Sequence, residues 1–205
     1  SRAETVSLAK RRLEVSEIPP AMAELLWGKA QGNPFYVEEI AYALRDTGKV
    51  LIRGGKCELA PGVDLGSLQF PDNVQGVVTS RIDRLAPAEQ LALKVASVIG
   101  RTFASHLLRD ICPIEEDKPL LDRHLDTLVT QNPTTPEAPE PEPAFSFRHV
   151  ITQEVAYQMM PPTQRRALHR AVAEWYESRY RADLSPFFPL LAKHWSSTDE
   201  AARAI

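Results

Sequence analysis

The run Gly54 to Cys57 (GGKC) carries the glycines and the lysine with which a phosphate-binding P-loop ends. A complete P-loop needs an earlier glycine, where this chain has Val50, and a Ser or Thr hydroxyl for magnesium, where it has Cys57. The run also precedes no predicted helix, so we predict the turn of a β-hairpin here. The chain has no Walker A motif, and we do not expect it to hydrolyse ATP alone.

The other residues that could do chemistry form no catalytic pattern. The histidines show neither an HExxH motif nor a paired metal-ligand spacing, and the serines lie in no nucleophile-elbow context. Glu38 and Glu39 are adjacent, so on a helix they point about 100° apart and cannot face each other as an acid/base pair. We expect them in a solvated first turn, and we expect no independent catalysis. The histidines and serines that show no such pattern are His106, His124, His149, His169, His194, Ser80, Ser105 and Ser146.

Composition indicates a globular protein of the cytoplasm. The chain has 205 residues, of which 43% are hydrophobic and 25% charged, and its net charge is −3. Two cysteines, Cys57 and Cys112, are too few and too far apart for a disulfide framework or a zinc knuckle. No apolar run approaches the roughly 20 residues that cross a bilayer, and the N-terminus lacks a signal-peptide hydrophobic region. We therefore expect a reducing, cytoplasmic location and no membrane partner.

Periodicity and punctuation predict a mostly α-helical chain in four sections. Residues 1–59 read as helices followed by a hairpin; Asn33 can cap one of these helices, and Pro34 suits its first position. Residues 60–86 read as a linker and a connecting helix. Residues 87–160 give three helices and then a loop between β-prone ends, the order of a winged helix. Residues 161–205 are helical again and look like the start of a repeat array, which one partial unit cannot prove.

The charge of the predicted winged helix argues against DNA binding. Between Ile111 and Phe147 the acidic residues outnumber the basic ones by six, and such a surface repels a duplex. The acidic residues are Glu115, Glu116, Asp117, Asp122, Asp126, Glu137, Glu140 and Glu142, against Lys118 and Arg123. The basic excess comes later, where we expect a solvated or ion-paired helix face: Arg148, Arg165, Arg166, Arg170, Arg179 and Arg181.

Four blocks of the sequence resemble, in the same order, the region after the P-loop core of STAND-class signalling ATPases, which are relatives of the AAA+ proteins. The blocks are GNPFYVEEIAYAL from Gly32, FPDNVQGVVTSRIDRL with LALKVASVIGRTF, FRHVITQEVAYQMMPPTQRRALHRAVAEWYE, and LLAKHW. The likeness runs from about Met22 to the end. It implies a helical lid with a hairpin, a winged helix and the start of a TPR-like array. Such modules occur in bacterial predicted ATPases and in soluble-type class III adenylyl cyclases, protein kinases and transcription regulators.

The resemblance also implies nucleotide contacts. The lid proline of the family, here Pro34, packs near the adenine, and the first N–H groups of the helix opened by Asn33 would face outward, free to form a nucleotide edge. The block around Arg148 and His149 is similar to the Met-His-Asp motif, whose histidine touches the β-phosphate of ADP. This sequence departs from that motif, since Val150 stands where the aspartate would be. The implied nucleotide-binding residues are Asn33, Pro34, Arg148 and His149.

Further positions also match the family pattern, among them Arg81, Asp83 and Arg84. For an arginine there we expect an interdomain ion pair, with contact to the nucleotide domain as the alternative. Tyr157 is expected to serve core packing or a buried hydroxyl bond. His169 also matches.

The sequence thus predicts a regulatory fragment that helps to clamp ADP or ATP, with Mg²⁺ in the parent protein, and transmits the nucleotide state to an effector domain. Its expected partners are the upstream nucleotide-binding core, the downstream helical repeats and a possible regulatory protein, with no nucleic acid. Two alternatives stay open. One is a nucleotide-independent interaction scaffold, and the other, less favoured, is a DNA-binding winged helix.

Overall fold

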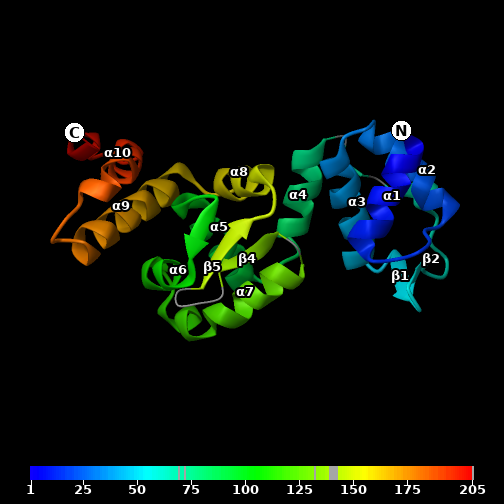
Figure 1. Cartoon of the computed structure of the whole chain (residues 1–205), viewed down its shortest axis with the longest axis horizontal. Helices are drawn as coiled ribbons and strands as arrows, with labels where there is room; N and C mark the ends of the chain where they lie inside the picture. The colour runs from blue at the N-terminus through cyan, green and yellow to red at the C-terminus, as the bar shows by residue number, and fades with distance from the viewer. Residues whose placement is uncertain (69, 72, 132, 139–142, 205) are drawn as a thin grey trace. The chain divides into compact units, whose positions relative to one another are not determined.

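The computed structural model describes residues 1–68, 70–71, 73–131, 133–138 and 143–204. The chain divides into two compact units, Ser1–Arg81 and Ile82–Ile205, here called unit 1 and unit 2 (Figure 1). Helices dominate both units, and the strands form small antiparallel sheets. The mostly α-helical prediction is therefore confirmed. The winged helix, the repeat array and the four-section division stay predictions.

Unit 1 is built around one buried helix. Every residue of α3 from Tyr36 to Leu44 is buried, so polar residues within that run must find partners inside the protein. The elements of unit 1 are α1 (Arg2–Leu13), α2 (Pro20–Ala30), α3 (Pro34–Asp46), β1 (Val50–Arg53), β2 (Lys56–Leu59), η1 (Leu65–Ser67) and α4 (Val74–Ile82), whose last residue falls in unit 2.

The GGKC run forms the predicted hairpin turn. Strands β1 and β2 pair antiparallel, with Val50 opposite Leu59 and Arg53 opposite Lys56. Gly54 and Gly55 make the turn with φ of 53° and 73°, the left-handed region that glycine adopts without strain. Cys57 is buried in β2 with its Sγ 3.9 Å from the sulfur of Met22. The two glycines therefore form the hairpin turn and Lys56 begins β2, whereas the end of a P-loop leads into a helix.

Unit 2 combines helices with a three-stranded antiparallel sheet in the order β3-β5-β4. Aromatic rings pack across the sheet: the ring centroid of Phe103 in β3 lies 6.0 Å from that of Phe145, on which it stacks, and 5.8 Å from that of Phe147, to which it is tilted; both partners belong to β5. The acidic residues Glu140 and Glu142 lie outside the described residues. The elements of unit 2 are α5 (Pro87–Ile99), β3 (Thr102–Ala104), α6 (Ser105–Ile111), η2 (Glu115–Leu120), α7 (Leu121–Thr130), β4 (Thr134–Ala138), β5 (Ala144–Phe147), α8 (Val150–Gln158), α9 (Pro162–Arg179), η3 (Ser185–Phe187), α10 (Phe188–Ser196) and η4 (Ala201–Ala204).

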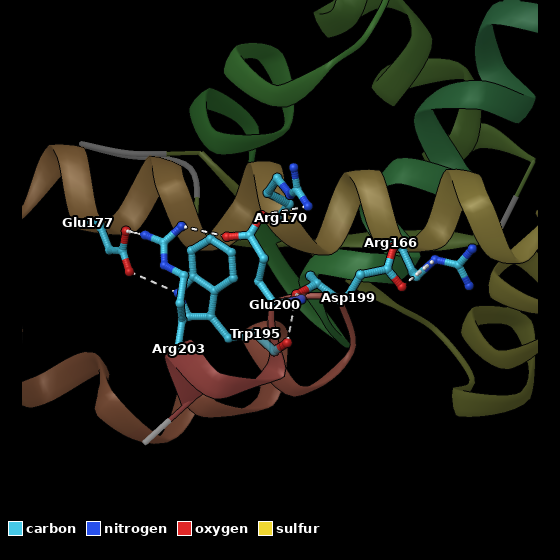
Figure 2. Close-up of polar contacts among 8 residues, drawn as sticks. Arg166, Arg170, Glu177, Trp195, Asp199, Glu200 and Arg203 are labelled. Carbon is cyan, nitrogen blue, oxygen red and sulfur yellow. Dashed lines mark hydrogen bonds and ion pairs between the residues drawn. The ribbon is translucent and has the colours of Figure 1, made fainter.

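A row of ion pairs joins residues 199–203 to α9. Figure 2 shows the buried Trp195 of α10, whose indole N–H donates to Glu177 at 2.8 Å while the guanidinium of Arg203 lies 3.6 Å from its ring centroid. Arg203 also pairs with Glu177 at 2.7 Å. Further along α9, Arg170 pairs with Glu200 at 2.7 Å and Arg166 with Asp199 at 3.3 Å. The ion-paired helix face predicted here is therefore confirmed for Arg166 and Arg170.

Candidate functional site

The start of α3 is capped from within, and this corrects one expectation. The side-chain oxygen of Asn33 accepts the N–H of Phe35 at 3.1 Å and that of Tyr36 at 3.3 Å, and its carbonyl accepts the N–H of Val37 at 3.2 Å. Pro34 has no N–H to offer. The first-turn N–H groups, which we expected to be open to a nucleotide, are thus already bonded. The proline ring itself is exposed, so it remains available for an apolar contact.

Glu38 and Glu39 are buried, and the prediction of a solvated first turn is wrong. Each side chain is about 5% exposed and meets an arginine from a different helix. Glu38 pairs with Arg12 of α1 at 2.9 Å, and Glu39 pairs with Arg81 of α4 at 2.7 Å. The angle of about 100° between adjacent helical residues, which excludes a catalytic pair, here lets one helix hold two neighbours.

Arg81 lies over one face of α3. Besides Glu39, its guanidinium lies 3.5 Å from a carboxylate oxygen of Asp46 and 5.2 Å from the ring centroid of Tyr42. Arg45 shares the same two partners, at 2.8 Å from Asp46 and 5.0 Å from Tyr42. All of these residues belong to unit 1. The ion pairs of Arg81 with Glu39 and Asp46 therefore lie within unit 1, and the expected interdomain ion pair stays a prediction.

A second attachment joins α3 to the segment before α4. The hydroxyl of Tyr36 donates a hydrogen bond to the backbone carbonyl of Pro71. Gly76 of α4 lies so close to Pro71 that a Cβ added to the glycine would fall 2.5 Å from the proline Cβ. Asn73 caps α4 by accepting the N–H of Gly76 at 2.8 Å. Pro71, before α4, and Arg81, near the end of α4, are thus both bonded to α3.

Arg148 and His149 form the junction between β5 and α8. The N–H of Arg148 donates to the carbonyl of Pro133 at 3.1 Å, and the carbonyl of His149 accepts the N–H of Thr152 at 3.1 Å. Both side chains are half-buried and make further interactions, while the adjacent Val150 is 54% exposed. The structure brings Asn33 next to Pro34 in unit 1 and Arg148 next to His149 in unit 2. Their nucleotide contacts stay a prediction.

A buried hydrogen-bonded chain of Tyr157, His169 and His194 was not predicted as a unit. The Tyr157 hydroxyl lies 3.0 Å from Nε2 of His169, whose Nδ1 lies 2.9 Å from Nδ1 of His194. The expected hydroxyl bond of Tyr157 is present, although Tyr157 itself is only partly buried. Burial lowers the pKa of His169 to about 4 and that of His194 to about 3, with the positive charge of Lys193 adding to both effects. Both rings are therefore neutral at neutral pH.

The hydrogen-bond pattern assigns the tautomers of the two rings. Nε2 of His194 is buried without a partner in the described part of the chain. A buried N–H without an acceptor is rarer than a buried acceptor without a donor, so we assign the His194 proton to Nδ1. His194 then donates to His169, and His169 donates through Nε2 to the Tyr157 oxygen. The spacing of 25 residues between the histidines gives no sequence signal for this contact.

The described residues contain no group of three or more His, Cys, Asp and Glu side chains that could hold a metal ion. No described helix has the length and apolar character needed to span a bilayer. The Tyr157–His169–His194 chain links α8, α9 and α10, and its chemistry is that of neutral hydrogen bonding. The strongest electrostatic feature of unit 1 is the pairing of Glu38 and Glu39 with arginines.

Comparison with known proteins gives a partial relationship. The chain is 33% identical over 76 residues to adenylate cyclase type 10 of Oryctolagus cuniculus, and 32% identical over 76 residues to adenylate cyclase type 10 of Mus musculus. The match covers 37% of this chain and 5% of the length of each relative. No protein-family profile matches the chain. Part of the chain is therefore related to a short segment of an adenylate cyclase.

Proposed function

We propose that this chain is a regulatory part of a STAND-type signalling ATPase, consisting of the lid and the winged helix. In this role it clamps ADP or ATP against a nucleotide-binding core and passes the nucleotide state to an effector domain. The observation that carries the proposal is the relationship to adenylate cyclase type 10, which agrees with the family resemblance of the sequence blocks. The name of these relatives favours a cyclase as effector over a kinase or a transcription regulator.

The order of elements in unit 2 supports the winged-helix part of the proposal. Helix α5, strand β3, helices α6 and α7, and strands β4 and β5 follow one another, and the three strands form one antiparallel sheet. A protein-interaction or regulatory role suits this domain better than DNA reading, because α7 carries Asp122 and Asp126 on a chain segment with few basic residues. The paired helices α9 and α10 would begin the TPR-like array.

The geometry divides the proposed nucleotide contacts between two kinds of interaction. Since Asn33 already caps the N–H groups of α3, the contribution of unit 1 is apolar packing of the exposed Pro34 ring against a base. Phosphate contact falls to Arg148 and His149, whose charge and N–H groups suit an anion. The bound nucleotide and Mg²⁺ would supply the charge to which these residues respond. A nucleotide shifts the conformation only if these contacts differ between the two states.

The test uses the parent protein extended upstream through its P-loop, purified as wild type and as His149→Ala, Pro34→Ala and His106→Ala. His106 is the matched control, because it lies in unit 2 with its ring 5.4 Å from Trp175. We expect wild type and His106→Ala to carry ADP, and the other two variants to lose most of it while staying folded. Equal ADP in all four proteins would refute the roles of Pro34 and His149.

One observation favours the alternative of a nucleotide-independent scaffold. The capped start of α3 leaves none of its first-turn N–H groups for an anion. On this alternative, unit 1 and the helices of unit 2 serve only to bind other proteins. If the extended wild-type protein carries no nucleotide and binds none when it is added, the scaffold becomes the better account.

A further inference from the structure

We propose that Glu39 and Arg81 form a latch that holds α4 on α3 and can open while the rest of unit 1 stays folded. The proposal goes beyond the function proposed above, because it holds whether or not the chain binds a nucleotide. The latch is defined as the cluster of Glu39, Tyr42, Asp46 and Arg81. Its opening would separate α4, the last element of unit 1, from α3.

The latch gathers its partners on a single face of α3. Glu39, Tyr42 and Asp46 follow one another at spacings of three and four residues, so a helix places them in one row. The guanidinium of Arg81 meets all three, at 2.7 Å from Glu39, 3.5 Å from Asp46 and 5.2 Å from the Tyr42 ring centroid. The single side chain of Arg81 therefore contacts α3 along two of its turns, from Glu39 to Asp46.

Burial makes the latch an all-or-none contact. The side chain of Arg81 is 11% exposed and that of Glu39 is 5% exposed, so both charges have little access to water in the docked state. Together with the neighbouring Arg45, the latch residues carry two positive and two negative charges. Without Arg81, Arg45 still pairs with Asp46, and the buried carboxylate of Glu39 is left uncompensated. Removing one partner of a buried ion pair is costly for this reason, and an intermediate with a half-broken pair is disfavoured.

The neighbouring glutamate gives α1 a separate attachment. Glu38 pairs with Arg12 of α1 at 2.9 Å and points to a different side of α3 from Glu39. Helix α1 also packs directly on α3 and α2. Helix α4 buries Val77 and Val78, and its polar attachments to α3 are the ion pair of Arg81 and the bond from the Tyr36 hydroxyl to Pro71, just before the helix. Two adjacent residues of α3 thus form ion pairs with two different helices.

Hydrogen exchange of the whole chain tests the latch. In Arg81→Met, which keeps an apolar stem and loses the charge, we expect the amides of α4 to exchange about a hundredfold faster, while those of α1 and α2 keep their wild-type rates. The matched control is Arg12→Met, in which α1 should loosen and α4 should not. The double variant Glu39→Gln/Arg81→Met removes both charges, so its α4 should exchange more slowly than in Arg81→Met alone.

Three results would overturn the proposal. Unchanged exchange of α4 in Arg81→Met would show that the ion pair does not hold the helix. Faster exchange throughout unit 1 would make Arg81 a part of the general core, and equal loosening of α4 by Arg12→Met would remove the separation between the two glutamates. None of these readouts depends on nucleotide, so failure of the latch is distinguishable from failure of the proposed function.

Discussion

Acidification should destabilise unit 2 through His169 and His194. The two rings are 3% and 0% exposed, and their pKa values are lowered to about 4 and about 3 from an ordinary value of 6.5. The unfolded chain therefore binds more protons than the folded chain once the pH falls below 6.5. The stability that the neutral pair contributes is fully present above pH 6.5 and is lost as the pH falls toward 4 and 3.

The expected loss at pH 5 follows from these values. Each pH unit below 6.5 removes about 1.4 kcal/mol per histidine as long as the folded ring stays neutral, so pH 5 removes about 2 kcal/mol per ring and about 4 kcal/mol for the pair. With an unfolding slope of about 2 kcal/mol/M, the urea midpoint should fall by about 2 M between pH 7 and pH 5.

Fluorescence of Trp175 and Trp195, the two tryptophans of unit 2, reports this unfolding. The measurement is best made in a Trp27→Phe background, because Trp27 belongs to unit 1 and is 38% exposed. His194→Gln should halve the dependence of the midpoint on pH. Tyr157→Phe is the control, since it removes a hydrogen bond but leaves both histidines, and should lower the midpoint equally at both pH values.

The same wild-type midpoint at pH 7 and pH 5 would contradict this role of the two histidines, because it would mean that the rings are hydrated or share a proton in the folded state. Full pH dependence in His194→Gln would also contradict it, because the acid sensitivity would then come from other groups.

Two further substitutions test unit 1. Gly76→Ala should lower the free energy of unfolding in urea, although alanine favours helices by about 1 kcal/mol over glycine, because its Cβ would meet Pro71 at 2.5 Å; a stabilised variant would contradict that close approach. Asn33→Ala should cost about 1 kcal/mol of thermal stability by leaving the N–H groups of Phe35 and Tyr36 unbonded, whereas Asn33→Ser should keep most of it; equal loss in both would show that the cap contributes nothing.

Features encoded by neighbouring residues were predictable from the sequence. Asn33 and Pro34 mark the start of α3 because a cap and a first-turn proline act within a few residues, and Gly54–Gly55 mark a hairpin because only glycine takes that turn freely. The strand β3 was not predicted, since it has three residues and pairs with β5 about 40 residues later.

Features that depend on distant partners were not predictable. Local spacing placed Glu38 and Glu39 on a helix but gave no sign of Arg12, 26 residues before Glu38, or of Arg81, 42 residues after Glu39. The contact of His169 with His194 likewise requires α9 and α10 to be packed first. In each case the helix was encoded locally, while the burial of a charged or titratable side chain was decided by tertiary packing.

The pairing of Glu39 with Arg81 has a consequence for dissecting this protein into pieces. A cut after residue 59, where the hairpin ends, would leave Glu39 on α3 without the cation that neutralises it, although Asp46 would keep Arg45, and would remove the acceptor at Pro71 from the Tyr36 hydroxyl. Such a fragment should misfold or aggregate even though its helices are complete. The shortest N-terminal fragment in which the buried charge of Glu39 is neutralised therefore extends to Arg81. The region after residue 59, whose sequence predicts a linker, is thus needed by the unit that it follows.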